Sequence, residues 1–334
     1  MSASVKRPGR TRASRGRVPD FFIVGHAKSG TTALYEMLRR HPQIYMPGVK
    51  EPMFFARNPP SVESEAGRFE RTGKRSETLD DYLSLFTAAR EDQMVGEAST
   101  FYLWSPYAPG RIAAAQPAAR IVAILREPAS FLYSLHLQMV QNHAETEKDL
   151  RAALALESAR REGRHIPRHA HWPAALIYSD RVRYVEQLRR YHSTFGPEQV
   201  LVLLYDDFRR DNRGTLRDVL RFLDVDDTVE LEPVEANPSV RVRSLRVDAL
   251  ERALRSSTAP AGRAARATFR SIAPRRLRHG VMHPLRRRVL YGRPSSPDET
   301  LMSDLRHRFR DEVLALSEYL DRDLVTLWGY DHLD

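Results

Sequence analysis

The chain has 334 residues, 42% of them hydrophobic, which is enough for one large domain or two small ones with an apolar core. It has no cysteine, and this excludes disulfides, cysteine-ligated zinc and thiol nucleophiles. The net charge of +10, supplied mostly by arginine, favours anionic partners such as nucleic acid, acidic glycans, anionic lipid or a polyphosphorylated cofactor.

The N-terminal segment is basic and rich in arginine, serine and glycine, and no apolar run follows its charges. A secretory signal needs such a run, so we expect residues 1–18 to form a disordered basic tail and residues 19–334 to form a single domain. The chain also has no run of about 18 apolar residues, the length of a membrane span. These features predict a cytoplasmic protein without a membrane span.

Short apolar runs alternate with longer amphipathic segments, which is typical of an α/β protein with a parallel sheet. In chain order, strands are expected at residues 20–27, 94–99, 119–127 and 199–208. Helices are expected at 31–41, from 128 onward, at 179–196, at 215–225 and, as one long helix or two, at 301–329. The third strand is almost continuously apolar, which indicates burial on both faces of the sheet.

The composition changes between Arg241 and Arg293, where 15 arginines face two acidic residues, Asp248 and Glu251, with prolines interspersed. This segment, 241–293, is interpreted as a mobile loop or as a lobe that faces the substrate. A solvated irregular surface is the alternative, and the sequence leaves it open. The chain contains no recognisable internal repeat.

The loop after the first strand has the features of an anion site. A turn with Gly25 and Gly30 leads into a helix, whose first backbone N–H groups and positive dipole end attract a negative charge. Lys28 adds a full positive charge. Hydroxyl donors come from Ser29, Thr31 and Thr32. In a nucleotide triphosphatase loop the lysine follows the last glycine, whereas Lys28 precedes Gly30, so a different anion is expected.

A second anion-binding element follows the third strand. Arg126 lies at the carboxyl end of that strand, where open α/β sheets bind ligands. Its forked guanidinium suits a phosphate, and Ser134, two turns into the helix that begins at Pro128, can donate to the same group. Each element alone is compatible with helix capping or a structural ion pair. Together they predict two separated anionic centres, one near Lys28 and one near Arg126.

These two elements resemble those of the sulfotransferases. "GHAKSGTTAL" resembles the 5′-phosphosulfate loop of that family, and "LREPASFLYSL" resembles its 3′-phosphate-binding element. "HPQIYMPGVKEPMFF" and "GEASTFYL" also resemble family segments, and the likeness extends over most of the chain from residue 20. It is nearest to the heparan-sulfate and bacterial type. It implies 3′-phosphoadenosine 5′-phosphosulfate (PAPS) as cofactor and a P-loop-NTPase-like three-layer α/β fold, with a central, mainly parallel sheet flanked by helices.

The resemblance also implies roles for individual residues. Sulfuryl transfer is an in-line displacement that builds charge on the leaving oxygen, and Lys28 is expected to stabilise that oxygen. Glu51, in "KEPMFF", matches the glutamate that acts as base in the heparan-sulfate type; a surface pair with Lys50 is the alternative. The expected cofactor ligands are Lys28, Ser29, Gly30, Thr31, Thr32, Arg126 and Ser134. A sulfuryl group carries less charge than a terminal phosphoryl group, so no metal is expected.

Several further positions are less specific. Tyr178 matches a family tyrosine or its neighbourhood, and Arg293, in "YGRPSSPDETL", resembles a late loop that closes over the 3′-phosphate. Tyr291 stands where that loop usually has a lysine. Histidine is the base in the cytosolic branch of the family, so His26 and His136 are alternatives to Glu51.

The sequence thus predicts a sulfotransferase whose acceptor is a hydroxyl of a glycan or of a small natural product. No nucleic-acid partner is expected, and the oligomeric state stays open. One alternative is a P-loop nucleotide-dependent kinase, in which Asp206 would hold the metal, but the order of the loop residues opposes it. Another is a non-enzymatic polyanion-binding protein. It explains the charge but not the placement of Lys28, Arg126 and Ser134.

Overall fold

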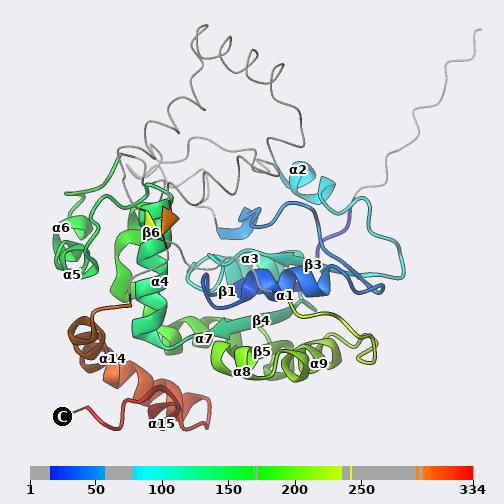
Figure 1. The fold of residues 1–334 in the computed structure, drawn as a ribbon. Coiled ribbons are helices and arrows are strands. Elements are labelled where there is room, and N and C mark those ends of the chain that lie inside the picture. Colours follow the sequence, from blue (N-terminus) through cyan, green and yellow to red (C-terminus); the bar gives the residue numbers. More distant parts are fainter. Residues whose placement is uncertain are drawn as a thin grey trace, which may run out of the picture. The chain divides into compact units, whose positions relative to one another are not determined.

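The structure is a computed structural model that describes residues 16–56, 78–168, 170, 172–234, 241–242, 291–292 and 296–333 (Figure 1). Most of the predicted tail, and all but four residues of the arginine-rich segment, lie outside these ranges. The contacts within the chain define two compact units. The sheet unit consists of the described residues of 1–63, 72–126 and 186–236, and the helical unit of those of 127–185 and 237–334. The single domain at 19–334 stays a prediction.

A parallel sheet of five strands forms the centre of the sheet unit, in the order β2-β3-β1-β4-β5. The strands are β1 (Phe21–Gly25), β2 (Ile44–Tyr45), β3 (Met94–Ala98), β4 (Arg120–Leu125) and β5 (Val200–Leu204). All of β1 and all but the first residue of β4 are buried, as expected for strands covered on both faces. The predicted parallel sheet is confirmed, and β2 adds an edge strand too short for the sequence pattern to reveal.

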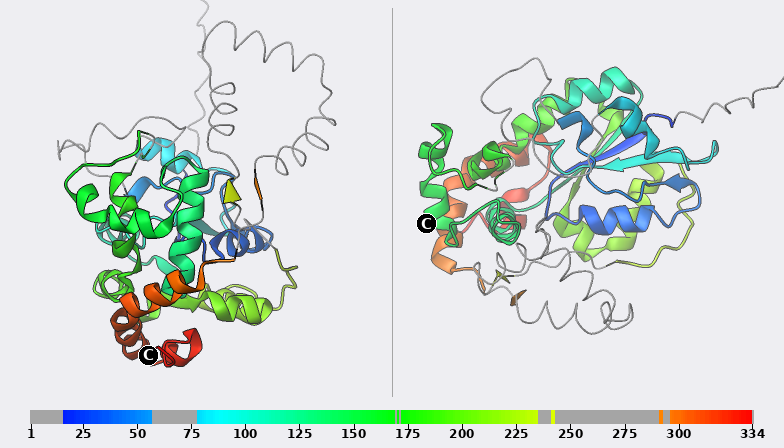
Figure 2. Two further views of the ribbon diagram at one scale, coloured as in Figure 1. Left: turned by 60° about the vertical axis from the view of Figure 1, so that its left-hand side comes forward. Right: turned by 90° about the horizontal axis from the view of Figure 1, so that it is seen from above.

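Helices cover both faces of this sheet. α1 (Thr31–Leu38) follows β1 toward the β2 edge, whereas α3 (Ala108–Ala115) leads from β3 past β1 to β4. Right-handed crossovers that run in opposite directions place their helices on opposite faces. Figure 2 (right) shows α1 and α9 (Asn212–Phe222) on one side of the sheet and α3 on the other. The P-loop-NTPase-like three-layer fold is therefore confirmed.

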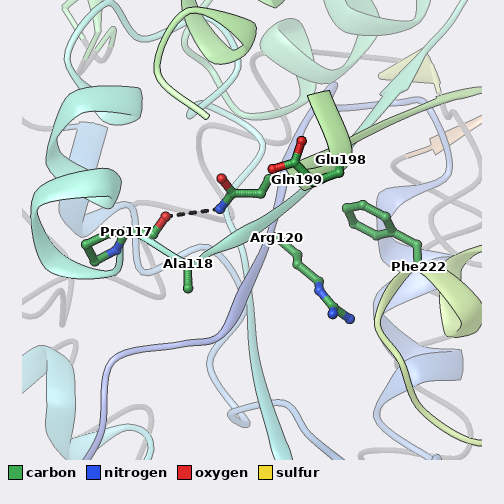
Figure 3. Close-up of a pocket in the computed structure, with 6 residues that line it drawn as sticks. All are labelled: Pro117, Ala118, Arg120, Glu198, Gln199 and Phe222. Carbon is green, nitrogen blue, oxygen red and sulfur yellow. Dashed lines mark hydrogen bonds between the residues drawn. The ribbon is translucent and has the colours of Figure 1, made fainter. Parts of the chain in front are cut away.

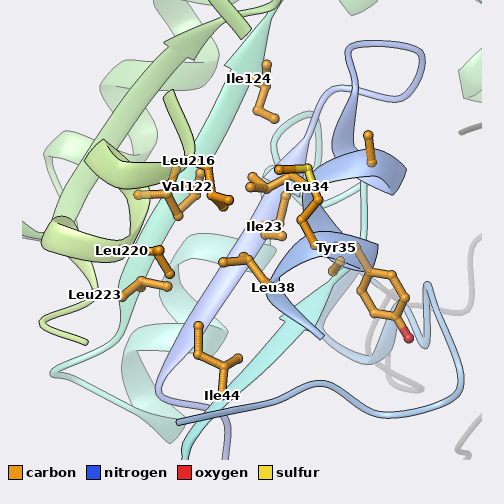
Figure 4. Packing of buried hydrophobic residues seen from close by; sticks show 14 of the residues in the cluster. Ile23, Leu34, Tyr35, Leu38, Ile44, Val122, Ile124, Leu216, Leu220 and Leu223 are labelled. Atoms are coloured by element: carbon orange, nitrogen blue, oxygen red, sulfur yellow. The ribbon is translucent and has the colours of Figure 1, made fainter. Parts of the chain in front are cut away.

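One apolar cluster fills the layer between the sheet and its α1 side (Figure 4). It joins side chains from β1, β4, α1 and α9, among them Ile23, Leu34, Leu38, Val122, Ile124, Leu216, Leu220 and Leu223. Apolar residues recur every three or four positions in both helices, so each buries one face. Burial of each such leucine stabilises the fold by about 1.5–3 kcal/mol. This packing fixes the end of β1 and the start of α1, and thus the loop between them.

The helical unit is organised around α4 (Pro128–Gln141), which packs against α14 (Glu299–Tyr319). Its other described elements are α5 (Leu150–Ala155), α6 (Glu157–Arg161), α15 (Leu324–Trp328) and the antiparallel strands β6 (Arg241–Val242) and β7 (Tyr291–Gly292). The Glu127 carboxylate caps α4 and also accepts a hydrogen bond of 2.7 Å from the Tyr330 hydroxyl. The start of α4 is therefore held by Glu127 just before it and by Tyr330 near the end of the chain.

Two predicted boundaries are wrong. The strand expected at 199–208 ends at Leu204 and continues as α8 (Tyr205–Arg210), whose first turn carries acidic residues that favour a helix N-terminus. The helix expected at 179–196 is a 3-10 helix (Tyr178–Val182) followed by α7 (Tyr184–His192), because Arg183 has a ψ of 65° and leaves the helical region. The closing segment forms two helices, α14 and α15, one of the two forms expected.

Candidate cofactor and catalytic site

The loop between β1 and α1 has the geometry of an anion site. Gly30, with φ of 88°, is the N-cap of α1 and has no side chain of its own to cap the first N–H groups of this helix. Open N–H groups at a helix N-terminus are suited to an anion. A side chain at Gly30 is excluded, because its Cβ would lie 2.9 Å from Cδ1 of Phe208. Lys28 also has a positive φ, 61°, a strained conformation for a residue other than glycine.

The Lys28 ammonium lies in an electrostatic environment that favours a bound anion. Burial lowers the pKa of Lys28, and the positive charge of Arg126 lowers it further. Both effects oppose the charged form of the lysine. An anion bound beside the two cations would offset them. The structure thus brings together the two cations that the sequence assigns to the anionic centres.

Arg126 directly follows the last residue of β4 and is held in two ways. Its Nη1 donates a hydrogen bond of 2.9 Å to the carbonyl oxygen of Lys28, and its guanidinium carbon lies 4.8 Å from the centre of the Tyr205 ring. The carbonyl fixes the guanidinium within the loop, and the ring supports one of its faces. Lys28 and Arg126 therefore adjoin one another at the carboxyl ends of β1 and β4, whereas the two separated anionic centres stay a prediction.

The hydroxyl-bearing residues of the loop differ in orientation. The Ser29 side chain is fully buried and donates a weak hydrogen bond of 3.4 Å to the carbonyl of Ala27. Ser29 is therefore better placed to offer its backbone N–H to a ligand than its hydroxyl. Thr31 is buried at the first position of α1, and Thr32 is half-buried. Their roles as phosphate ligands stay predictions.

Glu51 lies against the carboxyl end of β3, the neighbour of β1. Its backbone N–H donates to the carbonyl of Ala98 at 3.0 Å. Its Oε1 accepts hydrogen bonds from Nζ of Lys50 at 3.1 Å and from the Thr100 hydroxyl at 3.2 Å. The side chain keeps 29% of its surface exposed, as a base that meets an external substrate requires. The pair with Lys50 is thus present, and Thr100 aims the same carboxylate.

A buried carboxyl that the sequence reasoning did not single out lies behind Glu51. Glu97, in β3, is fully buried, and its Oε2 accepts hydrogen bonds from the hydroxyls of Tyr82 at 2.8 Å and Tyr102 at 2.9 Å. Burial raises the pKa of Glu97 to about 7; hydrogen bonds from Ser99 and the two tyrosines act against this rise, and the charge of Glu51 adds to it. The sequence feature that could have indicated Glu97 is its position, as an acidic residue, inside the apolar strand "MVGEA".

Burial of Glu97 makes folding stability depend on pH. Its carboxyl ionises near pH 4.5 in the unfolded chain and near 7 in the folded one. Between these values the folded state binds more protons, so the stability present at low pH is lost as the pH rises to about 7. Since Glu97→Gln cannot ionise, we expect its stability relative to the parent to rise by about 3 kcal/mol between about pH 4.5 and about pH 8. Urea unfolding at both pH values measures this, and a constant difference would contradict it.

The two histidines proposed as alternative bases are both internal. His26 is fully buried, with Nε2 2.7 Å from Oε1 of Gln187. His136, in the helical unit, is also buried; its Nδ1 lies 3.1 Å from the Tyr178 hydroxyl, and burial lowers its pKa. Both rings therefore have structural neighbours, and Glu51 is more exposed than either.

Tyr178 belongs to an internal polar network of the helical unit. Its hydroxyl donates to Oε2 of Glu145 at 3.1 Å, and that oxygen lies 2.7 Å from Nη1 of Arg160. Tyr178 itself is fully buried. Its cofactor role and that of Ser134, buried in α4, stay predictions, and Arg293 lies outside the described residues.

A pocket of about 560 Å³ lies at the opposite edge of the sheet (Figure 3). It is lined by Pro117, Ala118, Arg120, Glu198, Gln199 and Phe222. Arg120 is the first residue of β4 and Gln199 precedes β5, so the pocket adjoins the amino ends of these strands, away from Lys28 and Arg126. Within the described residues, no group of three or more histidine or acidic side chains is arranged to hold a metal ion.

The fold and the loop define a P-loop-like α/β protein with a candidate anion site at the carboxyl edge of its sheet. A model of the sulfotransferase family matches residues 19–229, and the chain belongs to this family. The crystal structure of a sulfotransferase from Alicyclobacillus acidocaldarius is similar, with 33% identity and a TM-score of 0.56, over 70% of this chain and 90% of that one.

Carbohydrate sulfotransferases are among the relatives. Human carbohydrate sulfotransferase 15 is 26% identical over 253 residues, which cover 62% of this chain and 44% of that protein. Human heparan sulfate glucosamine 3-O-sulfotransferase 6 is 33% identical over 143 residues, 41% of this chain and 37% of that one. The chain thus spans less than half the length of these relatives. No helix among the described residues has the length and apolar character needed to cross a membrane. The cytoplasmic location stays a prediction.

Proposed function

We propose that the protein transfers a sulfuryl group from PAPS to a hydroxyl of a carbohydrate. The observation that carries this proposal is the pairing of Lys28 and Arg126 beside the N-terminus of α1, where the N-cap is a glycine. PAPS has an anionic group at each end of its ribose, a phosphosulfate at the 5′ position and a phosphate at the 3′ position. Two adjoining cationic groups fit such a molecule. A metal ion is not part of this proposal.

The residues of the loop would stabilise the departing group. The reaction forms a bond between the acceptor oxygen and sulfur and breaks the bond from sulfur to the 5′-phosphate oxygen, so that adenosine 3′,5′-bisphosphate leaves. Lys28 and the first N–H groups of α1 would hold the charge that develops on this oxygen. Arg126 would bind the 3′-phosphate with its forked N–H groups.

Glu51 would take the proton of the acceptor hydroxyl. Its carboxylate is partly exposed and is oriented by Lys50 and Thr100, which leaves it able to face a substrate. It adjoins β3, the strand beside β1, and both strands end at the same edge of the sheet. Base and lysine therefore belong to one edge, where parallel α/β sheets bind their ligands.

Two observations favour a carbohydrate acceptor. The relatives named above are carbohydrate and heparan sulfate sulfotransferases, and the chain has a high positive charge that suits an acidic glycan. A hydroxyl of a small natural product is the other outcome to test. A screen of glycan fragments and small alcohols with PAPS, read by mass spectrometry of the sulfated product, distinguishes the two.

Calorimetric titration with adenosine 3′,5′-bisphosphate tests the donor. We expect it to bind about 10–100 times more tightly than adenosine 5′-monophosphate, because a charge-assisted phosphate contact contributes about 1.5–3 kcal/mol. ATP should bind more weakly than the bisphosphate. Binding of ATP as tight as that of the bisphosphate would support the kinase instead. Loss of binding on removal of residues 1–18 would support a polyanion-binding protein.

A further inference from the structure

The segment that carries Glu51 is anchored through alternate backbone N–H groups. The N–H of Glu51 donates to the carbonyl of Ala98 at 3.0 Å, that of Met53 to the Ser99 hydroxyl at 2.9 Å, and that of Phe55 to the Tyr102 hydroxyl at 3.2 Å. All three acceptors lie at the end of β3 or in the turn after it. The segment is thus fastened along one edge, much like a strand.

The anchors act against a strained backbone. Glu51 and Met53 have φ values of 61° and 56°, in the left-handed region that residues other than glycine rarely adopt. Such conformations persist only where the surroundings fix them. Loss of one anchor should therefore allow the segment to relax and should move the Glu51 carboxylate.

The third hydrogen bond, from the Phe55 N–H, depends on how the Tyr102 hydroxyl is oriented. Since Tyr102 accepts the N–H of Phe55, it must direct its own proton elsewhere, and Oε2 of Glu97 lies 2.9 Å away. The same oxygen accepts from Tyr82, whose ring stacks on Phe54 at 4.6 Å between centroids. Glu97 thus orients the one hydroxyl that holds the Phe55 backbone.

We propose that Glu97 is a positioning residue for Glu51: it accepts the O–H of Tyr102, so that the hydroxyl oxygen faces the Phe55 N–H as its acceptor, and it thereby holds residues 51–55 in their strained conformation. This inference rests on the proposed function, since it takes Glu51 as the base. Glu97 touches neither reactant. The polar and titratable groups that act on it are Glu51, Tyr82, Ser99, Tyr102 and, more weakly, Tyr191.

Two phenylalanine variants isolate the anchor. Tyr102→Phe and Tyr82→Phe each remove one hydroxyl from the same carboxylate oxygen and keep the ring, but only the first removes the acceptor of the Phe55 N–H. We expect Tyr102→Phe to lower kcat by about 10–100-fold, the scale of a displaced catalytic group, with the Kd of adenosine 3′,5′-bisphosphate unchanged. Tyr82→Phe should lower kcat at least several-fold less.

Glu97 itself is tested by a pair of variants. Glu97→Leu removes the acceptor of Tyr102 and also that of Ser99, which holds the Met53 N–H, so its kcat should fall at least as far as that of Tyr102→Phe. Glu97→Gln keeps an oxygen for both tyrosines and should recover most of the lost rate. Equal losses in Tyr102→Phe and Tyr82→Phe, or a Kd that rises in step with the fall of kcat, would show a merely structural role and overturn the inference.

Hydrogen exchange of the Phe55 amide provides a readout that does not depend on turnover. It should speed up in Tyr102→Phe and Glu97→Leu but not in Tyr82→Phe, because only the first two release that N–H. Unchanged exchange in Tyr102→Phe would overturn the inference even if its kcat fell. If the unaltered protein binds no adenosine 3′,5′-bisphosphate and transfers no sulfuryl group, the proposed function fails instead. The exchange data still test the anchor, so the two failures can be distinguished.

Discussion

Replacing Lys28 by glycine should lower sulfuryl transfer by about 10²–10³-fold, the loss expected when a group that stabilises a leaving oxygen is removed. It should also weaken the binding of adenosine 3′,5′-bisphosphate. The choice of glycine matters, because Lys28 has a φ of 61° and glycine adopts this conformation without strain. Burial and the charge of Arg126 both disfavour the Lys28 ammonium, so removing this group should not lower the stability of the folded protein. Thermal unfolding should therefore change little while activity is lost.

A matched control separates the backbone effect from the charge. Asp224 is an exposed residue of the sheet unit with a φ of 56°, so Asp224→Gly makes the same backbone change far from the loop. We expect this variant to retain full turnover. Turnover is followed as sulfated product from PAPS, and binding by calorimetry. A Lys28→Gly protein that is folded and still transfers at the parent rate would remove Lys28 from the mechanism.

β1 and β4 could be predicted because burial alone determines their pattern, and β3 could be predicted although Glu97 interrupts its apolar run. β1 and β4 are covered on both faces, so nearly every residue in them is apolar, and their positions follow directly from the sequence. The end of β5 could not be placed, because "YDDF" continues an apolar run and becomes α8 through its acidic first turn. β2 has two residues, and only its pairing with β3 makes it a strand.

The site divides in the same way between local and tertiary determinants. Lys28 and Arg126 could be predicted because a strand end followed by a helix fixes where each side chain emerges. The enclosure of Tyr178 depends on neighbours distant in sequence, so no local pattern indicates it, whereas the Ser29 hydroxyl donates to the carbonyl of Ala27, two residues away. Glu97 had a local signal, an acid inside an apolar strand, but the hydroxyls of Tyr82 and Tyr102 that account for it come from other segments.

Replacing Glu51 by glutamine should lower kcat by about 10²–10⁴-fold, the contribution of a positioned base, while the affinity for adenosine 3′,5′-bisphosphate stays unchanged. Glutamine keeps an oxygen that can accept from Lys50 and Thr100, and its backbone N–H can still donate to Ala98. The variant therefore preserves the position of the side chain and removes only its ability to take a proton.

The matched control for this substitution is Glu36→Gln. Glu36 lies on α1 in the same unit and is paired with Arg39 at 3.8 Å, so the variant removes a carboxylate from a comparable surface ion pair. Its kcat should equal that of the parent, since exposed pairs contribute little to stability and Glu36 lies outside the site. If Glu51→Gln also retained the parent kcat, Glu51 would be no more than the partner of Lys50. Both known alternatives are buried, His26 beside Gln187 and His136 beside Tyr178, so the acceptor would then have to lose its proton to solvent.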